Sequence, residues 1–223
     1  MLDTYETLDN VRKVAIFYDK RCDMSIMKQV RQYVSRLPKG KPVSTSSLMK
    51  FGTRAGVDQA LSRLAKEGFI TRVGRGLYFR PKVSPYVGEV PPRIMEVVKA
   101  KAGTATVQVN GAEAARKLGL STQVPTKVVF LTNGPNRHFN VGELEIAFKR
   151  VEQRKLLLAG RQAGLALSAF WFLGKKELNS EIVEKVRNIL PPEEFNALRN
   201  ELPSMPIWMQ NVFLENERMH LNA

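Results

Sequence analysis

Cysteine and histidine are scarce in this chain of 223 residues, which holds one cysteine, Cys22, and two histidines. A single thiol excludes a disulfide within the chain, so we expect a reducing compartment, the cytoplasm. His138 and His220 lie far from each other and from Cys22 in the sequence, a spacing that does not suit a zinc site or a Cys–His catalytic pair. Since a Walker-type phosphate-binding loop is also missing, the sequence predicts no catalytic residue, no metal and no cofactor.

Long apolar runs are absent as well. Residues 1–20 lack the apolar segment of a signal peptide, and the most apolar run, residues 165–173, is too short to span a bilayer. We therefore expect a soluble protein that does not have a membrane as its partner. Residues 1–23 show only loose helical spacing of apolar side chains and are predicted to be an N-terminal extension, either a helix packed on the next domain or a frayed arm.

Acidic residues are scarce in one part of the chain. The net charge of the protein is +14, and residues 24–86 carry 13 lysines and arginines against two acids, Asp58 and Glu67. The net charge of this stretch is therefore +11, compared with −1 for residues 1–23 and +4 for residues 87–223. Positive charge concentrated on a small domain predicts a partner with a phosphate backbone. A domain made basic for solubility is the alternative.

Within that basic stretch, the sequence predicts two short helices joined by a tight link. Thr53 is a typical N-cap, and Val57, Leu61 and Leu64 follow it at the spacing of one helix face. Gly68 is typical of the left-handed residue that follows a helix end. The shorter helix is expected just before the link, from residue 44 or 45 onwards.

A hairpin is predicted after the second helix. Residues 69–73 and 77–80 are strand-like, and Gly74, Arg75 and Gly76 between them are typical of a turn. Two helices, a tight link and a hairpin together predict a winged helix-turn-helix over residues 24–82.

The polar side chains of this predicted domain indicate a DNA interface. The second helix carries small or forked polar groups opposite its apolar face, and groups of this kind read base edges in a major groove. Basic groups on the hairpin and on the loop before the helices suit phosphates or a minor groove. The candidate DNA-binding residues are Lys39, Lys41, Ser46, Ser47, Thr53, Arg54, Gln59, Ser62, Arg63, Lys66, Arg72, Arg75 and Arg80. A solvated polar face beside an ordinary hairpin is the alternative.

A break in regular structure is predicted after the hairpin. Residues 83–92 contain Pro85, Gly88, Pro91 and Pro92, which are typical of a linker. We therefore place the boundary between two domains there.

Residues 93–223 are predicted to form a mixed α/β domain. Strand-like patterns occur over residues 104–109, 128–131 and 144–149, and helical patterns dominate afterwards. The expected fold class is α+β, with an N-terminal winged helix-turn-helix and a mixed α/β C-terminal domain that ends in helices.

A nuclease is the enzymatic alternative for this second domain. Glu143, Glu145 and Lys149 resemble the acid and lysine cluster of a nuclease. However, Glu145 and Lys149 fall on the outward side of an alternating strand, as expected of a solvated face. His138 is expected in a polar turn, as a surface residue. The sequence therefore predicts that the protein is not an enzyme.

Four segments resemble a known family. SRLPKGKPVSTSSL and RAGVDQALSRLAKEGFITRVGRGLYFRPK resemble the DNA-binding half of the AbiEi-type transcriptional antitoxins of bacterial abortive-infection systems. VNGAEAARKLGLSTQVPTKVVFLTNGP and RKLLLAGRQAGLALSAFWFLG resemble the second half of the same family. The second pair is the more specific, because helix-turn-helix proteins in general do not carry it. The likeness covers roughly residues 26–200.

This resemblance implies the antitoxin of a type IV toxin–antitoxin pair. In that family the N-terminal domain represses its own promoter by binding double-stranded DNA, usually at inverted repeats. The C-terminal domain counteracts a nucleotidyltransferase-type toxin, and a stable complex with the toxin is not required. The residues by themselves predict only a basic winged-helix DNA binder with an α/β partner domain. The alternative is a winged-helix interaction protein, or another transcriptional regulator, whose C-terminal domain binds a protein partner.

Overall fold

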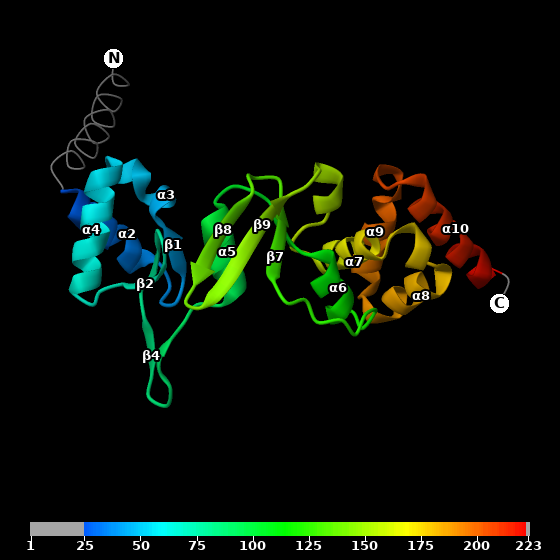
Figure 1. Ribbon diagram of the computed structural model, residues 1–223, viewed down its shortest axis with the longest axis horizontal. Helices are drawn as coiled ribbons and strands as arrows, with labels where there is room; N and C mark the ends of the chain where they lie inside the picture. The colour runs from blue at the N-terminus through cyan, green and yellow to red at the C-terminus, as the bar shows by residue number, and fades with distance from the viewer. Residues whose placement is uncertain (1–24, 222–223) are drawn as a thin grey trace, which may run out of the picture. The chain divides into compact units, whose positions relative to one another are not determined.

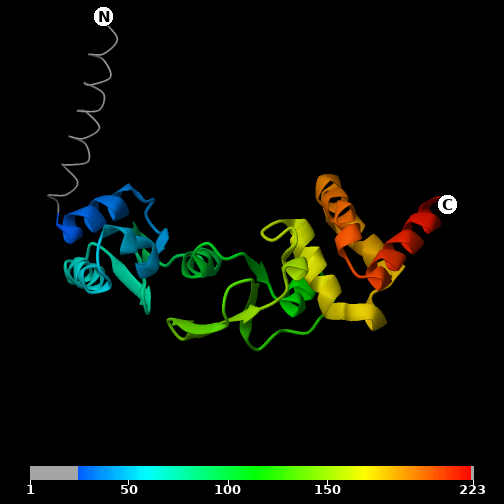
Figure 2. The same cartoon turned by 90° about the horizontal axis from the view of Figure 1, so that it is seen from above.

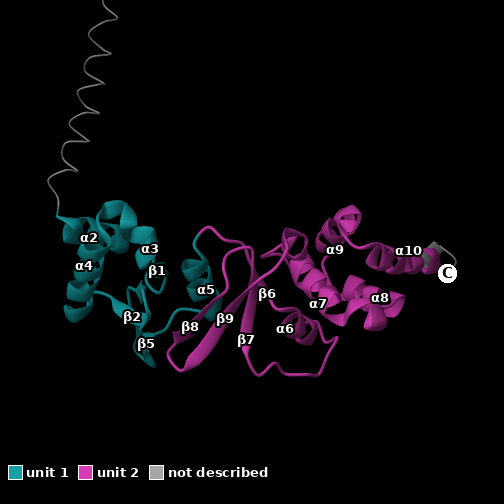
Figure 3. Cartoon of the chain, turned by 45° about the horizontal axis from the view of Figure 1, so that its top comes forward, with its two compact units in different colours: residues 1–103 teal, residues 104–223 magenta. Residues whose placement is uncertain are grey.

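The computed structural model describes residues 25–221 and separates into two compact units (Figures 1 and 3). Unit 1 comprises residues 1–103 and unit 2 comprises residues 104–223. The prediction of an N-terminal extension over residues 1–23 lies outside the described residues. Each unit has its own buried apolar cluster, so each is described by itself.

The helices of unit 1 begin where polar side chains cap them. Helix α2 (Ile26–Arg36) starts after Ser25, whose Oγ accepts the N–H of Lys28. Helix α4 (Arg54–Lys66) starts after Thr53, whose Oγ1 accepts the N–H of Gly56 at 3.3 Å. Both caps satisfy donors that a helix end otherwise leaves unpaired. Strand β1 (Pro42–Ser44), helix α3 (Thr45–Leu48) and the 3-10 turn η1 (Met49–Phe51) lie between the two helices.

Helices α2 and α4 pack against each other and form the core of unit 1. Val57, Leu61 and Leu64 of α4 are fully buried, as their spacing predicted. Gly56 allows a close approach, because a Cβ there would lie 2.6 Å from Cδ1 of Ile26. The first turn of α4 is thus held directly against the first residue of α2.

A small sheet completes this part of unit 1. Strands β2 (Thr71–Gly74) and β3 (Leu77–Phe79) form the predicted hairpin, and β1 pairs with β3 to give an antiparallel sheet of order β1-β3-β2. Gly76 in the turn has a φ of 69°, which favours glycine. The order of helices and strands is consistent with a winged helix-turn-helix.

The predicted linker differs from the structure. Strands β4 (Lys82–Ser84) and β5 (Gly88–Val90) form a second hairpin, which projects away from the helices of unit 1 (Figure 1). Helix α5 (Ile94–Ala102) follows and packs against β1 and β3, with Val97 and Val98 fully buried. Unit 1 therefore continues to residue 103, and the division lies after α5 rather than at residues 83–92.

Unit 2 opens with a four-stranded sheet of order β6-β7-β9-β8. Its strands are β6 (Val107–Val109), β7 (Val128–Thr132), β8 (Arg137–Val141) and β9 (Leu144–Arg150). The pair β7–β9 is parallel and the other two pairs are antiparallel. Strand β8 was not predicted, and the expectation of a turn at His138 is wrong, because His138 pairs with Ala147 across β8 and β9.

Helices form the rest of unit 2, as predicted, and gather at its C-terminal end (Figure 2). They are α6 (Gly111–Lys117), the 3-10 turn η2 (Gln153–Leu156), α7 (Gln162–Glu177), α8 (Ser180–Ile189), α9 (Pro192–Asn200), the 3-10 turn η3 (Leu202–Ser204) and α10 (Ile207–Leu221). Phe170 of α7 meets Phe213 of α10 edge to face, with ring centroids 5.8 Å apart. These aromatic side chains fill the centre of the cluster.

Helices α6 and α7 cross with almost no space between their backbones. A Cβ on Gly111 of α6 would lie 2.5 Å from the carbonyl oxygen of Ser168 in α7. Gly164 of α7 lies instead against the loop before that helix, since a Cβ there would lie 2.1 Å from the carbonyl oxygen of Leu158. Glycine is therefore required at both positions by contact rather than by backbone angle.

The fold class is α+β, as the sequence predicted. Among the described residues, no helix is both long enough and apolar enough to cross a membrane.

Candidate nucleic-acid interface

The outward side of α4 is exposed along its whole length. The seven polar or small residues opposite its buried face are all exposed: Arg54, Ala55, Asp58, Gln59, Ser62, Arg63 and Lys66. A helix with this exposed side and with its partner helix behind it has the form that enters a DNA major groove.

A groove of about 590 Å³ lies between α4 and the β2–β3 hairpin, and we call it the basic groove. Its lining residues are Arg54, Asp58, Ser62, Ala65, Lys66, Arg72, Arg75, Gly76 and Tyr78. Four of them are cationic and one is acidic, so the groove favours an anionic ligand. Five of the predicted DNA-binding residues meet here: Arg54, Ser62, Lys66, Arg72 and Arg75.

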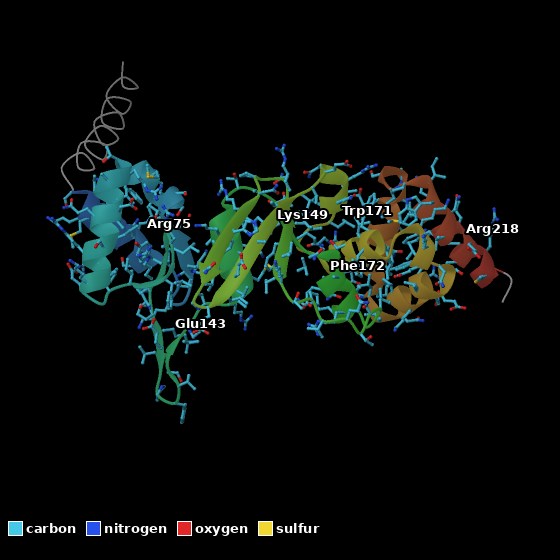
Figure 4. The ribbon with its side chains drawn as sticks, in the orientation of Figure 1. Arg75, Glu143, Lys149, Trp171, Phe172 and Arg218 are labelled. Atoms are coloured by element: carbon cyan, nitrogen blue, oxygen red, sulfur yellow. The ribbon has the colours of Figure 1, made fainter. Side chains whose placement is uncertain are left out.

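The tip of the β2–β3 hairpin is anchored on two sides. The N–H of Thr45 donates to the carbonyl of Gly76 at 2.9 Å, and Nζ of Lys101 donates to the carbonyl of Arg75 at 2.9 Å. The side chain of Arg75 nevertheless stays exposed (Figure 4). A fixed backbone with an exposed guanidinium suits a contact with a phosphate or a minor groove.

Other predicted residues lie outside the basic groove. Gln59 and Arg63 are exposed on α4, Ser46 is exposed on α3, and Lys39 and Lys41 are exposed on the loop before β1. Two hydroxyl groups have local structural roles. The hydroxyl of Ser47 donates to the carbonyl of Ser44 at 2.7 Å, and the hydroxyl oxygen of Thr53 accepts the N–H of Gly56 in the first turn of α4.

Arg80 has a structural role that the sequence did not reveal. Its guanidinium donates to the carbonyl of Ser35 at 2.9 Å and to that of Leu37 at 3.0 Å, at the end of α2. These bonds satisfy carbonyls that the helix leaves unpaired. Arg80 therefore has a part in holding the end of α2, and its contact with DNA stays a prediction.

Tyr78 and Ala65 line the groove but were not predicted as site residues. Tyr78 is largely buried in β3, where it stands between Leu77 and Phe79 in an apolar run that indicates a buried strand rather than a ligand site. Tyr78 and Ala65 come to line the groove only because of where α4 lies relative to the β2–β3 hairpin. A local sequence pattern does not predict that arrangement.

The two acids of residues 24–86 are each paired with an arginine. Arg31 of α2 pairs with Glu67 and also lies over the ring of Phe69, 4.8 Å from its centroid. Nε of Arg54 donates to Oδ2 of Asp58 at 2.8 Å. Among the described residues, neither acid forms an ion pair with Lys66, Arg72 or Arg75, and Nε of Arg72 donates to the carbonyl of Gly74 at 3.3 Å.

The acid and lysine cluster considered for a nuclease is not assembled. Glu143 lies just before β9 and Lys149 lies near the other end of that strand (Figure 4), whereas Glu145 faces His138 with Oε1 and Nδ1 3.7 Å apart. Within residues 25–221, no group of three or more histidine, cysteine, aspartate or glutamate side chains is placed to hold a metal ion.

Comparison with known proteins identifies a family without an assigned activity. No curated protein and no solved structure matches this chain. Residues 29–198 match a protein family described as a family of unknown function, DUF6088, and this match extends from α2 into α9. Because it covers more than half of the chain, the protein belongs to the DUF6088 family.

Proposed function

We propose that this protein is a transcriptional repressor that binds double-stranded DNA, including its own promoter, through unit 1. The basic groove carries the proposal, because it joins an exposed helix and a hairpin tip with four cations along one hollow. Helices of this type insert into the major groove while neighbouring cations hold the phosphates. Operators with inverted repeats are expected from the resemblance to AbiEi-type antitoxins.

From the same resemblance, we propose that the protein is also the antitoxin of a type IV pair and acts in the cytoplasm without being an enzyme. Unit 2 would counteract a nucleotidyltransferase-type toxin without holding it in a stable complex. Membership of the DUF6088 family assigns no activity, so this part rests on the four segments that resemble the antitoxins.

Binding of the full-length protein to a labelled fragment of its own promoter tests the repressor. If the basic face neutralises about 6 phosphates, log K falls with log salt with a slope of about −5. The double variant Lys66→Ala/Arg72→Ala should bind more weakly and with a shallower slope. Lys175→Ala/Lys176→Ala removes the same charge from exposed positions on α7 and is the matched control. An affinity that does not change with salt would remove the electrostatic basis of the proposal.

A protein-interaction module is the second candidate. The observation that favours it is the tip of the β4–β5 hairpin, where the side chains of Tyr86 and Val87 are 95% and 73% exposed. Exposed apolar side chains of this kind occur in protein–protein contacts. This candidate predicts no promoter binding above that of random DNA, which the same titration measures.

A further inference from the structure

Asp58 is the one acidic side chain among the residues that line the basic groove. Lys66, Arg72 and Arg75 line the same groove, which we propose to hold a polyanion. A carboxylate opposes such a ligand, because like charges repel and the groove excludes part of the screening water. An acid in the groove is therefore unfavourable for binding a polyanion unless it strengthens the contact that a neighbouring cation makes with that ligand.

That neighbouring cation is Arg54. Nε of Arg54 donates to Oδ2 of Asp58 at 2.8 Å, one helical turn along α4. The two side chains are 61% and 48% exposed, and an exposed pair of this kind stabilises a protein only weakly. The contact therefore contributes little to the stability of the fold. Its main effect is to orient the guanidinium of Arg54.

The contact leaves the reading edge of Arg54 available. It uses Nε, and no other group in the described part of the chain bonds the guanidinium. The terminal nitrogens Nη1 and Nη2 can therefore donate together to one acceptor pair. In a major groove, O6 and N7 of guanine form the pair that fits an arginine fork. Arg54 is also the first residue of α4, at the end that a recognition helix presents to bases.

We infer that Arg54 reads a guanine in the major groove and that Asp58 is its positioning residue. This inference rests on the proposed DNA-binding function and names the base that the groove selects. By holding Nε, Asp58 fixes the plane of the guanidinium before DNA arrives. A side chain that is already oriented loses less rotamer freedom on binding, so the guanine contact is stronger.

Selection from a randomised duplex library by the full-length protein tests both roles. Wild-type protein should enrich guanine at one defined position of each bound site. Arg54→Ala should reduce that preference by about 5- to 150-fold, the discrimination of one bidentate contact. Asp58→Ala should also reduce it at the same position, while affinity for random duplex stays unchanged or rises because the acid is gone. A merely structural role for Asp58 would lower both affinities together.

Two charge-matched variants serve as controls. Arg93→Ala and Glu89→Ala remove a cation and an acid from exposed positions of unit 1 outside the groove, and both should keep the guanine preference. Guanine enrichment that survives in Arg54→Ala refutes the reading role, and enrichment that survives in Asp58→Ala refutes the positioning role. Wild-type protein that binds duplexes without any guanine position overturns this inference alone. Wild-type protein that binds no duplex overturns the proposed function as well.

Discussion

Side chains of the proposed DNA interface are expected to differ in how much each contributes to the preference for one DNA sequence over another. Gln59 and Arg63 are exposed on α4, where they can reach base edges, whereas Arg75 sits on the hairpin tip. We predict that Gln59→Ala or Arg63→Ala loses about 1–3 kcal/mol on the preferred operator and little on random DNA. Arg75→Ala should weaken both and should reduce the size of the salt slope by about 1, because it removes one phosphate contact. Titrations of both duplexes at several salt concentrations measure this. A loss of sequence preference in Arg75→Ala alone would mean that the hairpin reads the bases.

Glu194 of α9 gives a prediction about pH at the same scale. Its Oε2 accepts the N–H of Ala163 at 2.9 Å, and its Oε1 accepts Nε of Arg161 at 3.1 Å, at the start of α7. These bonds, the one from Ala163 first, hold the pKa of Glu194 below its ordinary value of 4.5. A lowered pKa stabilises the folded state above that value, and the stabilisation is lost as the pH falls through the lower, folded-state pKa.

We therefore predict that Glu194→Gln melts at a lower temperature than wild type near neutral pH. The difference in Tm should narrow as the pH drops below 4.5 and should vanish once Glu194 is protonated in the folded protein. Glu193→Gln removes an exposed acid from the same first turn and is the control, with a smaller difference expected. A Tm difference that stays constant across this range would contradict the assigned role.

At the scale of residues, the sequence predicted whatever depends on near neighbours. Thr53 is the N-cap, and Val57, Leu61 and Leu64 are buried, because capping and helical spacing are local properties. The structural role of Arg80 was missed because its partners are carbonyls more than forty residues away in the chain. Which cations share the groove could not be predicted either, since that depends on how α4 lies on the sheet.

At the scale of elements, the crossing of α6 and α7 depends on Gly111. A Cβ on Gly111 would meet both the Ser168 carbonyl and Cβ of Phe172 at 2.5 Å, so the helices would have to move apart. We predict that Gly111→Ala lowers the free energy of unfolding by about 1–3 kcal/mol, as overpacking does. Lys117→Ala, at an exposed position of the same helix, should change it by less than about 0.5 kcal/mol. Urea denaturation of both variants measures this, and a fully stable Gly111→Ala would show that the crossing has room for a methyl group.

Elements that rely on distant pairing were the least predictable. Helix α4 and the helices that follow the sheet of unit 2 were expected because apolar residues recur in them at helical spacing. Strand β8 was missed because few apolar residues alternate with its exposed ones. Its extended conformation depends on antiparallel pairing with β9, which the sequence of β8 alone does not reveal. The β4–β5 hairpin was read as a linker because Pro85 and Gly88 are typical of both a loop and a tight turn.

At the scale of the whole molecule, the two units are expected to divide the work. Unit 1 carries most of the positive charge, and α5 belongs to it through the buried Val97 and Val98. We predict that residues 25–103 bind operator DNA on their own, more weakly than the full chain. A fragment that ends at residue 86 should melt at a lower temperature, because it lacks α5. Circular dichroism melts and promoter binding compare the two fragments.

Residues 104–223 provide the matching test of the antitoxin. We expect this fragment to fold without binding the operator tightly and to protect cells when the toxin is expressed from an unrelated promoter, which excludes protection through repression. Growth of cells that make the toxin together with each fragment is the measurement. If only unit 1 restores growth, or if the full chain does not, unit 2 is not an antitoxin. The repressor proposal would then rest on the basic groove alone.

The projecting β4–β5 hairpin has a consequence for limited proteolysis. Tyr86 is the most exposed large apolar side chain described, and a lone two-stranded hairpin is only marginally stable in water. Chymotrypsin should therefore nick the chain after Tyr86 before it cuts elsewhere in residues 25–221. Because α5 packs against β1 and β3, the two pieces should remain bound and elute together in gel filtration, separating only in denaturant. The peptide bond at this tip would thus be dispensable for holding unit 1 together.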